Sequence, residues 1–314
     1  MKILVTGVHG QLGHDVMNEL AKRGHEGLGT DIFPLDEKDG GTLNGHPYVQ
    51  LDITDREAVH ALIRERRPDA VVHCAAWTNV DGAEDPANRD KVYAVNAAGT
   101  RNIAEAAEEA GAKMLYLSTD YVFSGEGTEP WDPDCKEYRP LNYYGQTKLE
   151  GEKAVSSLVS RFFIVRIAWV FGVNGSNFVK TMLRLGQTHD TLRVVSDQIG
   201  TPTFTYDLAR LLVDMIETEE YGYYHATNEG GYISWYDFCV EIYKQCGVAT
   251  QVIPVSSAEY GLLKAARPHN SRLDRTKLVE AGFEPLPDWK DAVSRYLAEA
   301  ELMGSDPVEK ESKN

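Results

Sequence analysis

A glycine-spaced run near the start of the chain, Thr6-Gly7-Val8-His9-Gly10-Gln11-Leu12-Gly13, decides the fold. It follows the apolar residues Ile3-Leu4-Val5, and apolar residues then recur at helical spacing until Gly24. Such a turn is typical of dinucleotide-binding proteins, because glycines let backbone N–H groups reach a pyrophosphate at the helix N-terminus. The predicted cofactor-binding residues are Gly7, His9, Gly10, Gln11, Leu12 and Gly13, although the side chain of His9 is expected at the surface.

Strand-like and helical patterns alternate along the first half of the chain. Short apolar runs predict strands at Lys2–Thr6, Tyr48–Leu51, Ala70–Cys74, Lys113–Ser118 and Phe163–Ile167. A helix is expected from a capping box of Thr54 and Glu57 to about Arg67-Pro68. This alternation predicts the α/β class, with a Rossmann-type, doubly wound parallel sheet that carries helices on both faces.

The pattern changes after about Ile167 to shorter elements with loops rich in Gly, Pro and Asn. We expect a Rossmann domain over residues 1–167, with return segments near 192–217, and a smaller substrate-binding lobe over residues 168–303. The polar end of the chain, residues 304–314, is expected to be disordered. The segment Phe33–Pro47 is predicted to be a solvated surface loop.

Composition excludes several classes of function. The net charge of −16 argues against nucleic acids and anionic membranes as partners. No run reaches the roughly 18 apolar residues that a membrane span needs, and no signal peptide is evident, so we expect a cytoplasmic protein. The four cysteines form no CxxC pair and are predicted to be reduced thiols: Cys74, Cys135, Cys239 and Cys246.

An aspartate follows the glycine turn at the spacing of a ribose-binding carboxylate. Asp31 lies 18 residues after Gly13, and a carboxylate there accepts from the ribose 2′-OH and repels a 2′-phosphate. Neither Arg nor Lys stands beside it. The cofactor is therefore predicted to be NAD(H) or NADP(H), with NADH favoured. Asp52 and Ile53, after the next predicted strand, are expected beside the adenine.

Tyr144 and Lys148 form a YxxxK pair on one face of a predicted helix. A phenol, with a pKa of about 10, can serve as a proton donor near neutral pH when a nearby ammonium stabilises its phenolate. The preceding strand ends in Ser118-Thr119-Asp120-Tyr121-Val122-Phe123, and catalytic groups gather at the carboxyl ends of parallel strands. A hydroxyl of this run can share the substrate oxygen with Tyr144.

These motifs resemble a known family. The glycine turn, Ala75-Ala76, Asn96, the run 118–123 and YxxxK resemble the extended short-chain dehydrogenases/reductases. More narrowly, nearly the whole chain is similar to the dTDP-4-dehydrorhamnose reductases. The most specific matches are Asn177-Phe178, Asp197-Gln198-Ile199-Gly200-Thr201-Pro202-Thr203 and Arg267-Pro268-His269-Asn270-Ser271-Arg272-Leu273.

The resemblance implies an activity and a role for each matching residue. The activity is reduction of the 4-keto group of dTDP-4-dehydro-L-rhamnose, with Tyr144 as proton donor, Lys148 on the nicotinamide ribose and Thr119 completing the triad. Cys74, Ala75, Ala76 and Asn96 would also bind the cofactor. Thr78, Val80, Tyr121 and Trp169 would line the sugar pocket, and Asn177, Arg267, Asn270, Ser271 and Arg272 would hold the nucleotide diphosphate. Two arginines also suit a diphosphate bound to an acidic protein, although pairing with local carboxylates is the alternative.

Three other functions stay open at this point. A nucleotide-sugar 4,6-dehydratase or epimerase is the first, although dehydratases carry an acid where this chain has Tyr121. A reductase of another 4-keto sugar, for example a UDP-linked one, is the second. The third is a non-catalytic regulatory subunit, like those of S-adenosylmethionine synthetase, which would not need Thr119, Tyr144 and Lys148 together.

No metal site is expected. Some members of the resembled family bridge a dimer with magnesium held by glutamates, and the matching positions here are Asp15 and Tyr206. A tyrosine is a poor ligand for this hard cation. The protein is therefore expected to bind a dTDP-linked sugar as a monomer or as a homodimer without a metal bridge.

Overall fold

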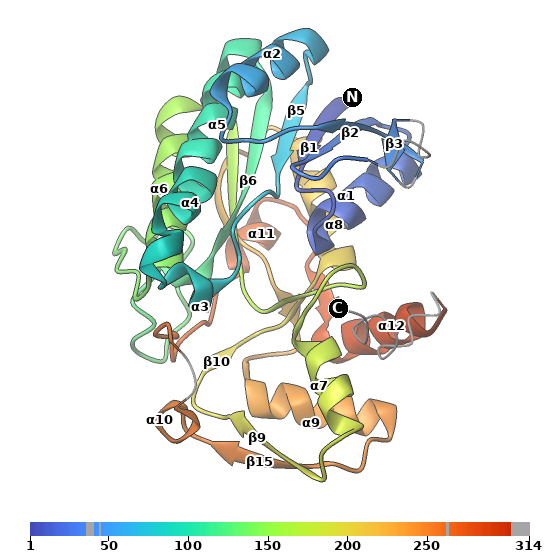
Figure 1. The fold of residues 1–314 in the computed structure, drawn as a ribbon, viewed down its shortest axis with the longest axis vertical. Coiled ribbons are helices and arrows are strands. Elements are labelled where there is room, and N and C mark those ends of the chain that lie inside the picture. Colours follow the sequence, from blue (N-terminus) through green and yellow to red (C-terminus); the bar gives the residue numbers. More distant parts are fainter. Residues whose placement is uncertain (36–40, 44, 262–263, 303–314) are drawn as a thin grey trace.

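The computed structural model describes residues 1–35, 41–43, 45–261 and 264–302, so the predicted disorder of residues 304–314 lies outside the described residues. An eight-stranded sheet forms its centre, in the order β12-β7-β6-β5-β1-β2-β4-β3 (Figure 1). Neighbouring strands are parallel, except that β3 is antiparallel to β4. The strands are β1 (Lys2–Thr6), β2 (Glu26–Asp31), β3 (Thr42–Leu43), β4 (His46–Gln50), β5 (Ala70–His73), β6 (Lys113–Thr119), β7 (Phe162–Ile167) and β12 (Gly222–His225).

Helices cover both faces of this sheet (Figure 1). Alternate residues of a strand point to opposite faces, so Ile3 and Val5 of β1 pack in one core and Leu4 in the other. The first core is closed by α1 (Gln11–Lys22), α8 (Thr205–Ile216) and α11 (Thr276–Glu280). The second is closed by α2 (Arg56–Arg66), α5 (Thr100–Ala110) and α6 (Tyr143–Leu158). The predicted fold class is confirmed.

The strand order reverses between β1 and β5. The chain passes from β1 to β2 and β4 on one side, and then returns to β5, β6 and β7 on the other side. In open parallel sheets, ligands bind outside the carboxyl ends of the strands at such a reversal. The chain after β5 forms short helical segments near this end of the sheet: α3 (Val80–Ala83), the 3-10 turn Pro86–Asn88, α4 (Arg89–Tyr93) and the π-helical stretch Ala94–Gly99.

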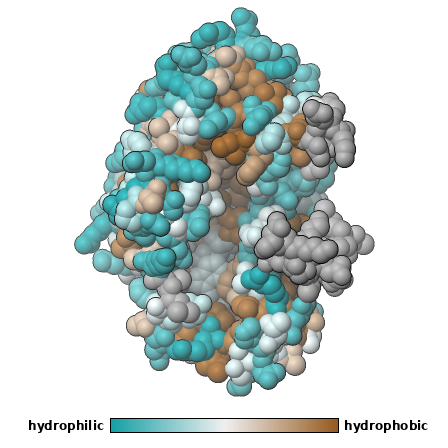
Figure 2. Space-filling view, in the orientation of Figure 1, coloured by the Kyte–Doolittle hydropathy of each residue, from teal (hydrophilic) through white to brown (hydrophobic). Residues whose placement is uncertain are grey.

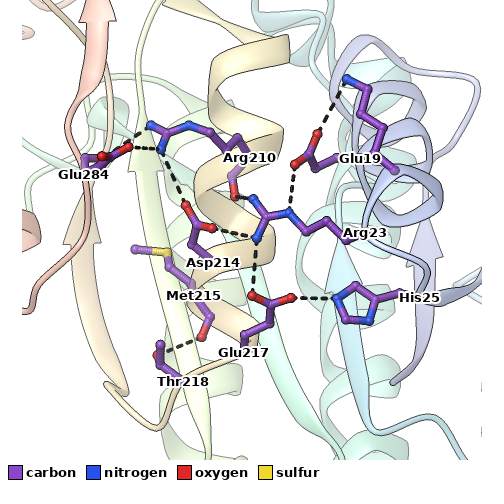
Figure 3. A network of polar contacts seen from close by, with 10 residues as sticks. Glu19, Arg23, His25, Arg210, Asp214, Met215, Glu217, Thr218 and Glu284 are labelled. Carbon is purple, nitrogen blue, oxygen red and sulfur yellow. Dashed lines mark hydrogen bonds and ion pairs between the residues drawn. The ribbon is translucent and has the colours of Figure 1, made fainter.

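The second half of the chain also contributes to the sheet and its helix layers. β12 extends the sheet beyond β7, and α8 packs on α1. Arg23 at the end of α1 donates to Glu19 at 2.8 Å and to Asp214 of α8 at 2.6 Å, and Glu217 pairs with His25 at 2.7 Å (Figure 3). These polar contacts hold the late helix against the first one. The domain limits drawn from the sequence stay a prediction.

The remaining elements form a smaller lobe with its own apolar core. Phe171, Phe204, Phe238 and Tyr296 are buried in it. On the face shown in Figure 2, the surface is hollowed between this lobe and the large sheet. The lobe contains α7 (Phe178–Gly186), α9 (Trp235–Cys246), α10 (Ser257–Tyr260), α12 (Trp289–Leu302) and the pairs β9 (Thr191–Val195) with β15 (Gln251–Val255), β10 (Ile199–Gly200) with β14 (Ile233–Ser234), β11 (Thr203–Phe204) with β8 (Val170–Phe171), and β13 (Asn228–Glu229) with β16 (Leu286–Asp288).

Two local predictions were wrong. The N-cap of α2 is Asp55, whose side chain accepts the N–H of Ala58, and Thr54 instead donates to Asp52, so the predicted capping box of Thr54 and Glu57 does not form. The predicted loop Phe33–Pro47 contains β3, which pairs with the start of β4, so that strand begins at His46 and not at Tyr48. No helix within the described residues has the length and apolar composition needed to cross a membrane.

Candidate active site

The glycine turn lies where the strand order reverses. Gly7 has a φ of +74°, and a Cβ there would lie 2.7 Å from the backbone nitrogen of Ala75, just after β5. A Cβ on Gly13 would lie 2.3 Å from the carbonyl oxygen of Gly7. At both positions the nearest atoms belong to the backbone, so a side chain at Gly7 or Gly13 would clash with them and displace the turn.

The N-terminus of α1 offers backbone donors to an anion. The helix begins at Gln11, and the N–H of His14 reaches back to the carbonyl oxygen of Gly10 at 3.3 Å. The N–H groups of Gln11, Leu12 and Gly13 precede this first helical bond and lie at the positive end of the helix dipole. This arrangement fits a pyrophosphate, which the sequence predicts at this turn.

Asp31 lies at the end of β2, against the same turn. One of its carboxylate oxygens accepts the N–H of His9 at 3.0 Å, and the other accepts the N–H of Ile32 at 2.8 Å. The side chain is 11% exposed. Each carboxylate oxygen keeps a second lone pair, so Asp31 can hold the turn and still accept from a ribose hydroxyl.

Asp52 and Ile53 lie beyond β4. Asp52 accepts the N–H and the hydroxyl of Thr54, at 2.9 and 2.7 Å. Ile53 is buried in the core, where a Cβ on Gly99 would lie 2.8 Å from its side chain. The side chains of both residues are thus engaged by the protein, and their contact with adenine stays a prediction.

The segment after β5, which includes Cys74, Ala75 and Ala76, is tied to both β1 and α6. The Thr6 hydroxyl accepts the N–H of Ala75 at 3.1 Å. The fully buried side chain of Asn96 accepts the N–H of Trp77 at 2.8 Å and donates to the Thr147 hydroxyl at 3.1 Å. Asn96 thereby positions this segment against the helix that carries Tyr144. Its direct contact with a cofactor stays a prediction.

The structure brings Thr119, Tyr144 and Lys148 together at the carboxyl end of β6. Thr119 is the last residue of β6, and α6 begins at Tyr143. The Lys148 ammonium donates to the carbonyl oxygen of Leu117 at 2.6 Å and lies 4.2 Å from the centre of the Tyr116 ring. The Thr119 side chain also acts on the Tyr144 phenol, whose pKa it lowers. The three predicted catalytic groups therefore share one corner, in which Thr119 and Lys148 are buried and Tyr144 is half-buried.

Burial shifts the pKa values of Tyr144 and Lys148 in opposite directions. It raises the pKa of Tyr144, and the charge of Asp120 raises that pKa further, whereas hydrogen bonding with Thr119 lowers it. Burial lowers the pKa of Lys148 to about 7, against the opposing effect of the Glu152 carboxylate. Tyr144 is consequently protonated at neutral pH, which is the form that a proton donor needs.

Two pairs of aromatic rings include residues that were predicted to line the sugar pocket. Tyr121 packs edge-on against Tyr144, with 5.8 Å between ring centres. Trp169 stacks on Trp235 with 3.8 Å between ring centres, and its φ of +51° is unusual for a bulky residue. Thr78 is exposed and precedes α3, and half-buried Val80 begins that helix.

The segment predicted to hold the diphosphate makes many internal contacts. Arg267 donates to Asp81 at 2.9 Å, while its Nη1 atom is buried without a hydrogen-bond partner in the described part of the chain. Arg272 donates to the side chain of Asn270 at 3.0 Å. Asn270 and Ser271 are each 2% exposed, and the amide of Asn270 donates to two loop carbonyls. Ligand binding by these four residues stays a prediction.

Asn177 contacts the glycine turn. It caps the N-terminus of α7 by accepting the N–H of Lys180, and its amide donates to the side chain of Gln11 at 3.1 Å. Asn174, from the same loop, donates to the carbonyl oxygen of His9 at 2.9 Å. This loop of the smaller lobe therefore lies against the predicted cofactor turn, and the diphosphate role of Asn177 stays a prediction.

Residues 1–302 match the family described as RmlD substrate binding domain. The chain belongs to this family. The chain is similar to the spore coat polysaccharide biosynthesis protein SpsK of Bacillus subtilis. The two are 38% identical over 298 residues, and the match covers 95% of this chain and 97% of SpsK. The resemblance stated from the sequence motifs is confirmed.

Solved structures similar to this RmlD-type chain have the same fold. The crystal structure of a dTDP-4-dehydrorhamnose reductase from Clostridium acetobutylicum has a TM-score of 0.86 at 40% identity, and the match covers 96% of this chain and 100% of that one. The dTDP-4-dehydrorhamnose reductase of Bacillus anthracis, solved in complex with NADP, has a TM-score of 0.84 at 39% identity and covers 95% of this chain and 99% of its own.

Three residues of this RmlD-type site were not assigned roles from the sequence. Asn174 contacts the cofactor turn, Trp235 stacks on Trp169, and Asp120 lies buried beside Thr119. No local pattern marks Asn174 or Trp235, because their partners are distant in the sequence. The sequence did contain a sign that Asp120 matters, because a carboxylate next to a predicted catalytic hydroxyl requires a partner or an altered pKa.

Proposed function

We propose that this protein is a dTDP-4-dehydrorhamnose reductase, which reduces the 4-keto group of dTDP-4-dehydro-L-rhamnose with a reduced nicotinamide cofactor. The observation that carries the proposal is the shared corner of Thr119, Tyr144 and Lys148 at the carboxyl end of β6, in the same sheet whose first strand leads into the glycine turn. The similar reductases of Clostridium acetobutylicum and Bacillus anthracis support it. A regulatory subunit would not require these three side chains together, and a dehydratase would require an acid in place of Tyr121.

The chain's own groups fit such a cofactor. The close backbone approach at Gly7 and Gly13 and the free N–H groups that begin α1 suit a pyrophosphate, and Asp31 suits a ribose. When bound, the reduced nicotinamide supplies the hydride that adds to C4 of the sugar. Tyr144 gives its phenolic proton to O4 as charge develops there, and the Lys148 ammonium stabilises the phenolate that remains.

The nucleotide sugar would occupy the hollow between the two parts of the molecule (Figure 2). The sugar would lie against Tyr121, whose ring packs on Tyr144, and against Trp169, whose ring stacks on Trp235. Arg267 would bind the diphosphate through its Nη1 atom, which has no hydrogen-bond partner among the residues that the structure describes. The adjoining Arg272 would add a second positive charge, which a dianionic ligand of an acidic protein requires.

The test of this function is Tyr144→Phe, which removes the proton and keeps the ring. We expect kcat to fall by about 10²–10⁴-fold with NADH and the 4-keto sugar nucleotide, because general acid catalysis contributes that much. NADH affinity, measured by fluorescence titration, should be nearly unchanged. Lys148→Met should reduce both kcat and NADH affinity. A Tyr144→Phe protein within a few-fold of the wild-type rate would refute the proposal and favour the regulatory reading.

The proposed function includes a preference for NADH over NADPH. The support is Asp31, whose carboxylate is fixed at the turn by the N–H groups of His9 and Ile32. A negative charge at this place repels a 2′-phosphate and accepts from a 2′-OH. Parallel assays of kcat/KM with the two cofactors test the preference, and a wild-type protein that strongly favours NADPH would contradict it.

We also propose that assembly does not depend on magnesium. Asp15, Glu19, Tyr206 and Glu299 line a hollow of about 340 Å³ over α1, α8 and α12, but the Lys22 ammonium lies 4.3 Å from the Tyr206 ring centre and donates to its hydroxyl at 3.2 Å. Within the described ranges, no three His, Cys, Asp or Glu side chains are grouped to hold a metal. A chelator should leave the sedimentation coefficient unchanged, and a dimer that split into monomers would contradict this.

A further inference from the structure

Asp120 is a buried carboxylate in the proposed catalytic corner, and the mechanism above does not use it. It directly follows Thr119, begins the short turn Asp120–Val122 and is 3% exposed. Its Oδ1 atom accepts the Thr119 hydroxyl at 3.0 Å. Its Oδ2 atom is buried without a hydrogen bond of regular geometry among the described residues, although the Ser271 side chain is near enough to favour the ionised form. A carboxylate in this state is costly unless it has a function or becomes protonated.

Close backbone contacts keep Asp120 in this position. A Cβ on Gly145, in the first turn of α6, would lie 2.3 Å from the carbonyl oxygen of Tyr121. A Cβ on Gly125 would lie 2.3 Å from the side chain of Pro268 on the other side. The backbone around Asp120 is therefore packed closely against α6 and against the segment that carries Ser271.

The Thr119 hydroxyl has one proton and several possible acceptors. That proton is now donated to Asp120, and the hydroxyl oxygen accepts the N–H of Tyr121 at 3.2 Å. While Asp120 is ionised it can only accept, so it retains the proton of Thr119. A neutral carboxyl group can donate its own proton to Thr119 instead, which frees the Thr119 hydroxyl to donate elsewhere.

We propose that Asp120 is a positioning residue whose protonation decides whether the Thr119 hydroxyl donates to Asp120 or to the oxygen that receives the proton of Tyr144. The inference rests on the proposed reductase function. In the ionised state, the reacting oxygen has Tyr144 as its only donor from this pair. In the neutral state it has two donors, and the developing charge on the oxygen is better stabilised.

The protonation of Asp120 is expected to change within a pH range in which the enzyme can be assayed. Burial raises the pKa of Asp120 to about 6, although Ser271 and Thr119 favour its ionised form. Tyr121 on the same turn and Tyr144 from α6 are the titratable groups that face it, and both phenols have raised pKa values. Arg267 and Asp81 act on Tyr121 from beyond it, with opposite signs. Asp120 is therefore neutral below about pH 6, so the two-donor state is present at low pH and is lost as the pH rises.

The experiment compares the pH profiles of wild type and Asp120→Asn. The asparagine amide can donate to Thr119 at every pH, so it reproduces the neutral carboxyl group. We expect wild-type kcat/KM to fall about tenfold between pH 5 and pH 8, as one hydrogen bond to the reacting oxygen is lost. The Asp120→Asn profile should lack this fall and exceed the wild-type value at pH 8. A fall that persists unchanged in Asp120→Asn belongs to another group, such as Lys148, and overturns the proposal.

Two further measurements keep the test decisive. In a Thr119→Val background, Asp120→Asn should have no effect on the pH profile, because the hydroxyl that Asp120 controls is missing; an equal effect in both backgrounds would overturn the inference. Infrared difference spectra of the protein without cofactor should show the carbonyl stretch of a protonated carboxyl group below about pH 6, as expected from the raised pKa. Ser271→Ala should move that transition to higher pH, even if Asp120→Asn fails to fold.

The outcomes separate this inference from the proposed function. A wild-type protein that reduces no 4-keto sugar nucleotide would remove the function itself. An active wild-type protein whose infrared transition is absent would remove only the role of Asp120.

Discussion

The glycine turn and the arginine segment (Ala265–Leu273) are both predicted to bind parts of the ligands, but different atoms build them. At the turn, backbone meets backbone: Gly13 approaches Gly7, and Gly7 approaches Ala75. The arginine segment is held by side chains, since Asp81 accepts both the N–H of Ala265 and the guanidinium of Arg267, at 2.9 Å each. The turn is therefore shaped by close backbone contacts, whereas the Arg267 guanidinium is held by an internal carboxylate through one nitrogen while its Nη1 atom has no hydrogen-bond partner among the described residues.

The largest expected effect in this comparison comes from a methyl group in the turn. In Gly13→Ala the new Cβ would lie 2.3 Å from the carbonyl oxygen of Gly7. Overpacking of this kind costs about 1–3 kcal/mol, occasionally more, and here the atom that must move carries the turn. We expect NADH affinity to fall by about 10²-fold in a fluorescence titration, together with a lower thermal unfolding midpoint.

Gly10→Ala is the matched control. Its Cβ would lie 3.1 Å from the same carbonyl oxygen, so a shift of a few tenths of an ångström can relieve the contact. The loss of affinity should be several-fold smaller than for Gly13→Ala. Equal losses would show that the turn is mobile and that the contrast with the arginine segment is wrong.

The second prediction concerns the ion pair of the arginine segment. If Arg267 binds the diphosphate, Arg267→Ala removes a charge-assisted hydrogen bond of about 1.5–3 kcal/mol, and KM for the sugar nucleotide should rise about 10–10²-fold while NADH affinity is unchanged. Asp81→Asn should leave KM equal or lower, because the guanidinium then loses a competing carboxylate. Steady-state kinetics of both variants give the answer.

A purely structural ion pair gives a different pattern. Both variants would then lower the unfolding midpoint by similar amounts and leave KM unchanged. In that case the pairing of Arg267 with a local carboxylate is its whole role, and the diphosphate must be bound by other groups, such as Arg272.

The contrast also explains what could be predicted from the sequence. The turn, the strands and the face shared by Tyr144 and Lys148 follow from local spacing, which is why they could be placed without a structure. The partners of Arg267 and Asn177 could not, because Asp81 and Gln11 lie far away along the chain. Even local chemistry can mislead: Asp55 caps α2 although Thr54 and Glu57 have the spacing of a capping box, because Asp52 already holds Thr54.

The smallest expected effect concerns Asp31, a side chain that serves the backbone-built turn. Its carboxylate accepts the N–H of His9 from the turn, at 3.0 Å, and is proposed to accept from the ribose 2′-OH as well. Asp31→Ala removes both interactions and the repulsion toward a 2′-phosphate. We expect the ratio of kcat/KM for NADH to that for NADPH to fall about tenfold, which corresponds to about 1.4 kcal/mol.

Asp31→Asn separates the two tasks of this residue. The amide oxygen can still accept the N–H of His9, so the turn should keep its shape, while the negative charge is lost. If the charge sets the preference, Asp31→Asn should shift the cofactor ratio nearly as far as Asp31→Ala, with a smaller loss of NADH affinity. If the carboxylate acts only by holding the turn, Asp31→Ala should weaken NADH and NADPH equally, and Asp31→Asn should behave like wild type. That second result would make Asp31 part of the turn's framework, and the preference for NADH would then lack its support.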